Sequence, residues 1–388
     1  MRRPTAAMRP SPRPTGARPH QALAAPGPSL RAGLPGARPG PAPCPAPSAG
    51  GLRLAVVVLA LAAVLVLTVL VSVTIGPADI AVTDVLGSIG HHLGLVGDAP
   101  PRLTDAIVWE LRLPRVLTAA AVGAGLAVAG AVMQSLTRNP LADPYLLGLS
   151  SGASLGAVAV LLLGAAVALP AAAFVGALAA LVATMALAGS LGALTPTRTV
   201  LAGLAVSQLC AAATSFVIFW SATGDSYREI LGWLLGSLAG STWASVTIAG
   251  AAVLVLGSAL VGAGRTLDAF AFGDTAAAAL GVHVARTRWV LLTLVALLTG
   301  ALVSVSGSIG FLGLVLPHAV RFVVGARHRL LLPVSALVGA SFLVWADTAA
   351  RTIFEPRELP VGILTAFLGA PVFAWLLFRS RRGAEGAS

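Results

Sequence analysis

The chain has 388 residues, of which 57% are hydrophobic and only 10% are charged. Soluble globular domains carry about 25% charged residues, so this composition excludes a soluble enzyme or a soluble binding module. The formal net charge of +11 comes from arginine alone, since the chain has no lysine. These arginines lie in the amino-terminal tail and at predicted helix ends rather than on a folded basic face, so we expect no nucleic-acid binding.

Residues 1–50 are rich in Pro, Arg, Ala and Gly and show no apolar periodicity. Such a segment buries too little surface to offset its chain entropy, so a disordered cytoplasmic tail is predicted. Arg2-Arg3 is typical of a twin-arginine signal, but the apolar region begins only near Leu54, which is too far away. We interpret the segment as a dispensable extension or a start codon placed too far upstream; a functional tail is the alternative.

Ten apolar runs follow, each long enough to cross about 30 Å of hydrocarbon as a helix. Backbone groups in lipid must be paired within their own segment, which favours helices over open sheet. The sequence therefore predicts an all-α polytopic membrane domain over residues 51–382, with a short tail at 383–388. Residues 230–240 are too short to cross and are expected at the outer interface. The predicted spans are 54–75, 113–136, 145–169, 171–194, 199–220, 243–264, 289–306, 309–325, 332–349 and 360–378.

An even number of spans places both termini on the same side of the membrane. Arginines collect on that side and acidic residues on the other, which is the positive-inside pattern and predicts that both termini are cytoplasmic. The arginines of the first side are those of the tail and Arg53, Arg138, Arg198, Arg265, Arg286, Arg288, Arg327, Arg329, Arg379, Arg381 and Arg382; the acids of the second are Asp79, Asp84, Asp98, Asp105, Glu110, Glu355 and Glu358.

The sequence offers no catalytic or metal-binding pattern. A Walker A loop needs a lysine for the nucleotide phosphates, and this chain has none. Cys44 lies in the tail and Cys210 in a predicted span, so a disulfide between them is implausible, and no His/Cys cluster has zinc spacing. We therefore predict that the chain is not an enzyme and binds no cofactor or metal, and that any ATP it depends on is used by another chain.

Two segments carry a resemblance to a known family. Residues 110–153 read ELRLPRVLTAAAVGAGLAVAGAVMQSLTRNPLADPYLLGLSSGA, and residues 307–378 contain the blocks GLVLPH and ELPVGI. Together with LRLPR and NPLADP, these blocks resemble the permease subunits of ABC importers for iron-siderophore complexes, haem and vitamin B12, the FecCD type. The resemblance covers about residues 52–382 and implies a type II ABC importer permease fold.

Three arginines stand near predicted outer helix ends. On spacing alone, such side chains simply extend to lipid headgroups. The resemblance instead implies that they bind glutamates on the two lobes of a substrate-binding protein, a role that suits the bidentate guanidinium. Asp347 lies one helical turn before the third arginine and is expected to hold its guanidinium in place. The predicted docking residues are Arg112, Arg115 and Arg351.

The connection between residues 268 and 288 is the longest on the predicted cytoplasmic side. Asp274 is a good N-cap, residues 275–280 a helix of under two turns, and Gly281 a C-terminal stop. So short a helix must rest on this chain's own membrane face or on a partner. The resemblance implies contact with an ATPase; an ordinary structured loop is the alternative. The predicted coupling residues are Asp268, Gly273, Asp274, Ala277, Leu280, Gly281, Val282, His283 and Arg286.

Residues 137–144 form a predicted inner hinge. A proline disfavours helix in the residue before it, so Asn139-Pro140 and Asp143-Pro144 predict a sharp turn and a restart. The hinge either contacts the ATPase or serves as an inner gate, or else is merely a tight connection. The resemblance also implies that the fifth and tenth spans line a translocation path. For the fifth, the predicted lining residues are Thr199, Gly203, Ser207 and Gln208.

Taken together, these features predict a permease subunit of an ATP-driven, binding-protein-dependent importer in the cytoplasmic membrane, with iron(III)-siderophore as cargo and haem or cobalamin as alternatives. The implied partners are a second permease (identical or a paralogue), two ABC ATPases, a binding protein and membrane lipid. A stand-alone secondary transporter is the rival from another class. It is disfavoured because ion-coupled carriers hold ionisable residues at mid-membrane, and these span centres hold almost none.

Overall fold

The computed structural model describes residues 49–95, 100–163, 168–190, 192, 195–221 and 226–385. The predicted disordered tail, apart from its last two residues, lies outside the described residues, as does Asp98. Across the described ranges every regular element is helical. This confirms the predicted all-α class.

The first half of the chain contains α1 (Ala49–Thr74) and α2 (Val82–His92), followed by α3 (Arg102–Ala106), η1 (Ile107–Arg112) and α4 (Leu113–Thr137), which run on as one helix. After a turn come η2 (Pro144–Leu147), α5 (Leu149–Leu163), α6 (Leu169–Ser190) and α7 (Pro196–Ser221). The second predicted span therefore begins earlier than residue 113. Arg112 and Arg115 consequently lie within a long helix rather than at its end.

The second half begins with α8 (Ser226–Leu234), which is too short to cross a membrane, as predicted. It continues with α9 (Trp243–Ala252), η3 (Val253–Gly257) and α10 (Ser258–Gly262), then the short helices α11 (Gly264–Ala271) and α12 (Asp274–Ala279). The last four helices are α13 (Val284–Ser306), α14 (Leu312–Val324), α15 (His328–Thr352) and α16 (Val361–Glu385).

Among the described residues, seven helices are long and apolar enough to cross a membrane. Three shorter apolar helices, Leu149–Leu162, Leu312–Val324 and Val361–Trp375, lie at the third, eighth and tenth predicted spans. Each of the ten predicted runs thus contains a helix within its described residues, but the total of ten crossings stays a prediction, because these three are short. The seven longer spans are Ala55–Thr74, Arg102–Thr137, Leu169–Ser190, Pro196–Ser221, Trp243–Gly262, Val284–Ser306 and His328–Thr352.

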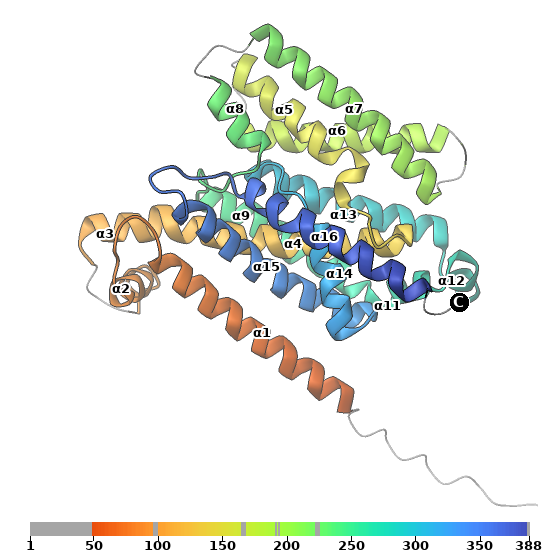
Figure 1. Cartoon of the computed structure of the whole chain (residues 1–388), viewed down its shortest axis with the longest axis horizontal. Helices are drawn as coiled ribbons and strands as arrows, with labels where there is room; N and C mark the ends of the chain where they lie inside the picture. Colours follow the sequence, from red (N-terminus) through yellow and green to blue (C-terminus); the bar gives the residue numbers. More distant parts are fainter. Residues whose placement is uncertain are drawn as a thin grey trace, which may run out of the picture. The chain divides into compact units, whose positions relative to one another are not determined.

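Helix α4 is the centre of the packing, with α9, α13, α14 and α15 around it (Figure 1). Almost every residue from Leu113 to Leu136 is buried, and its neighbours approach closely because the contact points are glycines. A Cβ added to Gly123 would overlap the carbonyl of Gly339 on α15, and one added to Gly130 would overlap that of Gly313 on α14. Between apolar helices, such close backbone contact supplies the van der Waals packing that stabilises a membrane bundle.

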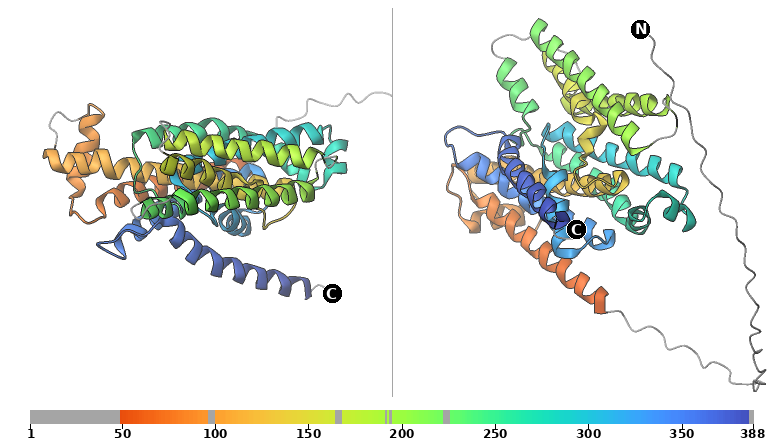
Figure 2. Two further views of the ribbon diagram at one scale, coloured as in Figure 1. Left: turned by 90° about the horizontal axis from the view of Figure 1, so that it is seen from above. Right: turned by 45° about the vertical axis from the view of Figure 1, so that its right-hand side comes forward.

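Helices α5, α6 and α7 pack on one another, and α6 and α5 join this group to α13. Figures 1 and 2 both show α7 at the edge of the group, and one of its faces carries exposed apolar side chains such as Leu209 and Phe219. Helix α16 packs on α14 and α15 and also exposes large apolar side chains, among them Phe367 and Trp375.

The long helices leave two opposite ends (Figure 1). One end, here called the Arg112 end, holds α2, α3 and the connection 353–360. The other, the α12 end, holds α11, α12 and the turn 138–143. The predicted functional residues lie at these two ends and along α7.

Candidate functional site

Arg112 caps the carboxyl end of α1. Its Nη1 donates to the carbonyl oxygens of Val73 and Thr74 at 2.9 and 3.0 Å, and its Nη2 donates to that of Ala78 at 2.6 Å. The last carbonyls of a helix lack partners within the helix and carry partial negative charge, so a guanidinium satisfies them well. The side chain is 5% exposed. Arg112 therefore fastens α1 to the α3–α4 helix.

Arg115 joins α4 to α15 and to the segment before α16. Its Nε donates to Asp347 Oδ2 at 2.8 Å and its Nη2 to Asp347 Oδ1 at 3.0 Å, which is a bidentate pair. Its Nη1 donates to Glu358 Oε2 at 2.7 Å. Asp347 is almost fully buried, whereas the Glu358 side chain is 42% exposed. One guanidinium thus holds a buried carboxylate and an accessible one.

Arg351 also binds α1. Its Nη2 donates to the carbonyl oxygen of Ser72 at 2.5 Å and to the Ser72 hydroxyl at 3.0 Å, and that hydroxyl lies 2.6 Å from the hydroxyl of Thr348. The expectation that Asp347 would hold Arg351 is wrong, because the Asp347 carboxylate points to Arg115 on α4. Asp347 thus binds Arg115, which is 232 residues away in the sequence, rather than Arg351, which is four residues away on the same helix.

The structure brings the three arginines together. Arg112, Arg115, Arg351 and Glu358 line one cavity of about 360 Å³ at the Arg112 end. Each guanidinium is nevertheless mostly buried and bound to this chain's own groups. Docking of a binding protein by these residues remains a prediction. The geometry shows that they connect α1, α4 and α15 within this chain.

At the α12 end, the predicted short helix is present but begins one residue early. Gly273 is the N-cap with φ 95°, and Asp274 is the first helical residue rather than the cap. The Asp274 carboxylate accepts a hydrogen bond from Arg288 Nη2 at 2.9 Å, so it is not available to cap the helix. The predicted stop is confirmed, since Gly281 follows the C-cap with φ 82°.

Asp268 is bound internally too. Its Oδ1 accepts from the backbone N–H of His328 at 2.8 Å and lies 2.8 Å from His328 Nδ1. It therefore caps the amino terminus of α15, although it comes from α11. Sequence reasoning missed His328, because a partner 60 residues away leaves no local signal.

The remaining coupling residues divide between the interior and the surface. Ala277 is fully buried, which anchors α12 on the bundle, and Gly273 and Val282 are half-buried. Gly281, His283 and Arg286 are exposed, as are the large apolar side chains of Phe272 and Leu280 at 79% and 69%. Exposed apolar side chains that form a contiguous patch mark sites of contact with proteins or membranes.

The predicted hinge turns sharply, as expected. Helix α4 ends at Thr137, and Arg138 adopts a left-handed conformation with φ 51°. Asn139 Oδ1 accepts from Leu141 N at 3.0 Å, and Asp143 Oδ1 accepts from Tyr145 N at 2.8 Å, capping η2. Burial raises the pKa of the Asp143 carboxyl from 3.8 to about 6, although this N–H bond opposes the rise.

The hinge lies beside α12. A Cβ built on Gly273 would lie 3.4 Å from Arg138 Nη1, so the two predicted cytoplasmic segments are neighbours. Asn139 and Pro140 are exposed, whereas Pro144 is buried and lies close to Gly313 of α14. The first half of the hinge is therefore surface and the second half is core.

The four predicted path residues do not share a face of α7. Thr199 and Gly203 are buried within the chain, and a Cβ on Gly203 would overlap the carbonyl of Leu146. Ser207 is half-buried and Gln208 is exposed. Gly203 packs against η2, and of the four residues only Gln208 is exposed, so the assignment of these residues to a translocation path stays a prediction.

Comparison with known proteins identifies the chain. The model of the FecCD transport family matches residues 64–379. The chain belongs to this family. BtuC of Halobacterium salinarum, a cobalamin import system permease protein, is 48% identical over 281 residues, which cover 71% of this chain and 74% of that protein. FecD of Escherichia coli, an Fe(3+) dicitrate transport system permease protein, is 45% identical over 278 residues, with coverages of 71% and 86%.

A solved structure agrees with the sequence relatives. It is described as a metal-chelate type ABC transporter in an inward-facing conformation, and it aligns with a TM-score of 0.73 and 32% identity over 83% of this chain and 99% of that one. This chain is therefore a multi-pass membrane permease of an ABC importer.

The permease has a functional candidate that sequence reasoning missed. A cavity of about 620 Å³ is lined by the end of α8, the irregular segment 307–311 and the first half of α16, and its walls are mainly apolar. The irregular backbone is well satisfied: Ser237 N donates to Ser306 O at 2.9 Å, and Gly362 N donates to Gly236 O at 3.1 Å. Glycine-interrupted apolar runs, GSLAG and GSIG, were the available signal.

Proposed function

We propose that this permease imports iron(III)-siderophore complexes across the cytoplasmic membrane, powered by ATP that a partner subunit hydrolyses. The observation that carries the proposal is the 620 Å³ cavity, because none of the described residues that line it has an ionisable side chain. Ion-coupled transport places charged residues on its path, whereas a bulky chelate that must be released needs only a weakly polar wall. This wall favours an ATP-driven importer over a secondary transporter.

The Arg112 end serves as the docking face for an extracytoplasmic binding protein. Arg112, Arg115 and Arg351 surround a single cavity there, and the accessible Glu358 shows that a carboxylate fits against Arg115. The charge distribution supports this orientation. The α12 end carries Arg138, Arg265, Arg286, Arg327 and Arg329, which favours the cytoplasmic side.

The α12 end serves as the contact for the ATPase. The exposed Phe272, Leu280 and Arg286 supply a mixed apolar and cationic surface, and the buried Ala277 and the Asp274–Arg288 pair fix it to the bundle. Because the chain has no lysine, it has no Walker A loop of its own. Movement of α12 would reach the bundle through Arg288 on α13 and through the Asp268–His328 contact to α15.

A second permease, identical or a paralogue, completes the path. The 620 Å³ cavity is lined from one side by α16, the end of α8 and residues 307–311, so two such walls facing one another would enclose a route for the cargo. The exposed Gln208 on α7 and Phe367 on α16 are available on the outward faces for this arrangement.

Cobalamin is the second candidate cargo, favoured by the 48% identity with the cobalamin permease of Halobacterium salinarum. Haem is a third, since HmuU of Yersinia pestis, a hemin transport permease, is 42% identical. The test is uptake into proteoliposomes that contain this permease, its ATPase and its binding protein, using labelled ferric hydroxamate, ferric citrate, haem and cobalamin. We expect ATP-dependent accumulation of a ferric chelate; accumulation of cobalamin or haem alone would contradict the proposed cargo.

A further inference from the structure

Two carboxylates share the Arg115 guanidinium, and they differ in accessibility. Asp347 takes Nε and Nη2 and has a side chain 2% exposed, whereas Glu358 takes Nη1 and has a side chain 42% exposed. Glu358 also lines the 360 Å³ cavity at the Arg112 end. The position beside Nη1 is thus a carboxylate site open to the outside, and it is already occupied by this chain.

The contact with Glu358 can be exchanged, whereas the contact with Asp347 cannot. Breaking a buried pair leaves an uncompensated charge in the interior, but a partly exposed ion pair contributes little to stability. A second carboxylate entering the cavity can therefore replace Glu358 at low cost. It would also lie near Arg351, which lines the same cavity.

Glu358 is also linked to the wall of the path. It lies three residues before α16. Leu359 N donates to Ala350 O at 3.1 Å, and Gly362 N, in the first turn of α16, donates to Gly236 O at 3.1 Å. Release of Glu358 removes the one described side-chain bond of segment 353–360 to α4.

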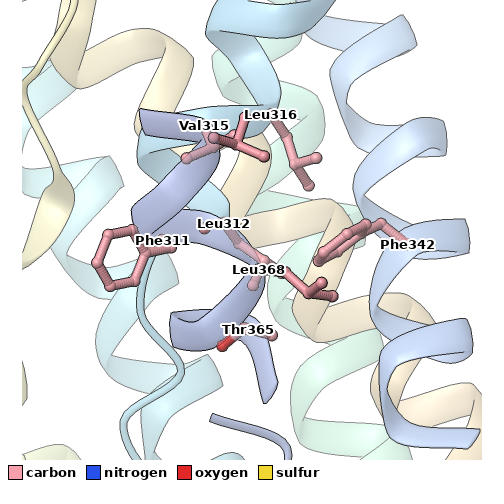
Figure 3. A pocket seen from close by; sticks show the side chains of 9 residues that line it. Phe311, Leu312, Val315, Leu316, Phe342, Thr365 and Leu368 are labelled. Carbon is pink, nitrogen blue, oxygen red and sulfur yellow. The ribbon is translucent and has the colours of Figure 1, made fainter. Parts of the chain in front are cut away.

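Behind α16 there is room for movement. An apolar cavity of about 60 Å³ lies between α14, α15 and α16, and Figure 3 shows Leu312, Phe342 and Leu368 directed into it from these three helices. The Thr365 hydroxyl on its wall donates to Gly362 O at 3.0 Å, so no unpaired polar group there needs a bound water. A shift of α16 toward α14 and α15 can fill this space.

We propose that Glu358 is a built-in competitor for the carboxylate of a docking protein. In the resting permease it occupies Arg115; on docking, a carboxylate side chain of the binding protein displaces it, and the freed segment 353–360 lets α16 move. The inference rests on the proposed function, because it takes the Arg112 end as the docking face and α16 as a wall of the path. It assigns Glu358 the opposite effect from a docking residue: its charge weakens docking.

The test compares Glu358→Gln with Glu355→Gln in the complete permease–ATPase complex in lipid nanodiscs. Glu355 is exposed on the same connection and provides a matched loss of one charge. We expect Glu358→Gln to lower the Kd for the binding protein about two- to fivefold, as expected for an exposed ion pair. Amide hydrogen exchange over residues 357–366 should become faster, and Glu355→Gln should change neither quantity.

Unchanged or weaker docking of Glu358→Gln would overturn the inference, as would an equal gain in Glu355→Gln, which would indicate a general charge effect. Glu358→Ala provides a second variant and should act in the same direction. ATP-driven uptake by the wild-type complex, measured in parallel in proteoliposomes, separates failure of the competitor role from failure of the proposed function. If the wild type takes up cargo but Glu358→Gln docks with unchanged affinity, only the competitor role is contradicted. If the wild-type complex binds no binding protein, the proposed function is contradicted as well.

Discussion

Replacing Asp347 with alanine should strongly destabilise the folded permease. Asp347 is 1% exposed and accepts hydrogen bonds from Arg115 at 2.8, 3.0 and 3.1 Å. Removing it leaves a buried guanidinium whose one remaining partner among the described residues is the accessible Glu358. Truncating one member of a buried ion pair typically costs about 3–5 kcal/mol, so we expect a loss of this size in the free energy of unfolding.

The assay is equilibrium unfolding of the purified permease in mixed micelles at neutral pH. The Asp347→Leu/Arg115→Leu double variant should recover most of the loss, because replacing both members of a buried pair with apolar side chains of similar volume is often neutral. Glu358→Ala should cost less than about 1 kcal/mol, since its pair is partly exposed.

Two results would refute this reasoning. A loss below about 1 kcal/mol for Asp347→Ala would show that Arg115 finds another partner or reaches solvent. A double variant as unstable as the sum of its two single variants would show that the two residues act independently. Either result would remove the ion pair as the connection between α4 and α15.

Three further predictions concern other parts of the permease. Gly130→Ala should lower the free energy of unfolding by about 1–3 kcal/mol, because the added methyl overlaps the Gly313 carbonyl. The control Gly250→Ala should not, because its methyl meets no atom within 4 Å. Equal effects of the two variants in thermal unfolding would contradict the α4–α14 contact. Asp143→Asn keeps an acceptor for Tyr145 N and removes a buried charge. Because the folded pKa of about 6 lies above the ordinary 3.8, the wild type loses stability as pH rises from about 4 to 6, by up to about 3 kcal/mol. The variant should therefore gain stability above pH 7 and show little gain near pH 4; a gain independent of pH in thermal unfolding would contradict the burial of the charge. Ala277→Pro should remove the bond from Ala277 N to Gly273 O and disrupt α12, so that ATP hydrolysis by the complex continues without uptake in vesicles; intact coupling would show that α12 is incidental.

Local patterns in the sequence predicted the elements of this fold well. Each of the ten apolar runs contains a helix within the part of the chain that the structure describes. The turn at Asn139-Pro140 and the stop at Gly281 lie where proline and glycine indicated. These features depend on residues close together in the chain. The sequence did not predict that the second span begins at Arg102. The π-helical segment Ile107–Arg112 contains Glu110 and Arg112, and these charged residues made the apolar run appear to begin only after them.

The contacts of the site could not be predicted in the same way. Asp347 was expected to hold Arg351, its neighbour on one helix, but it binds Arg115 on another. Asp274 was expected to cap its own helix, but it binds Arg288. In both cases tertiary packing brings a guanidinium next to the carboxylate, and the two form a charge-assisted hydrogen bond. The sequence shows which groups are charged, but spacing along the chain does not show which of them will be in contact in the fold.

The central claim is that a partner subunit supplies the energy and this permease transmits it to a path through the membrane. The most direct measurement is cargo accumulation in liposomes that hold either the permease alone or the permease with its ATPase and binding protein. With the complex, accumulation should require ATP and persist without any ion gradient. Sustained accumulation by the permease alone, driven by a pH or sodium gradient, would contradict the account.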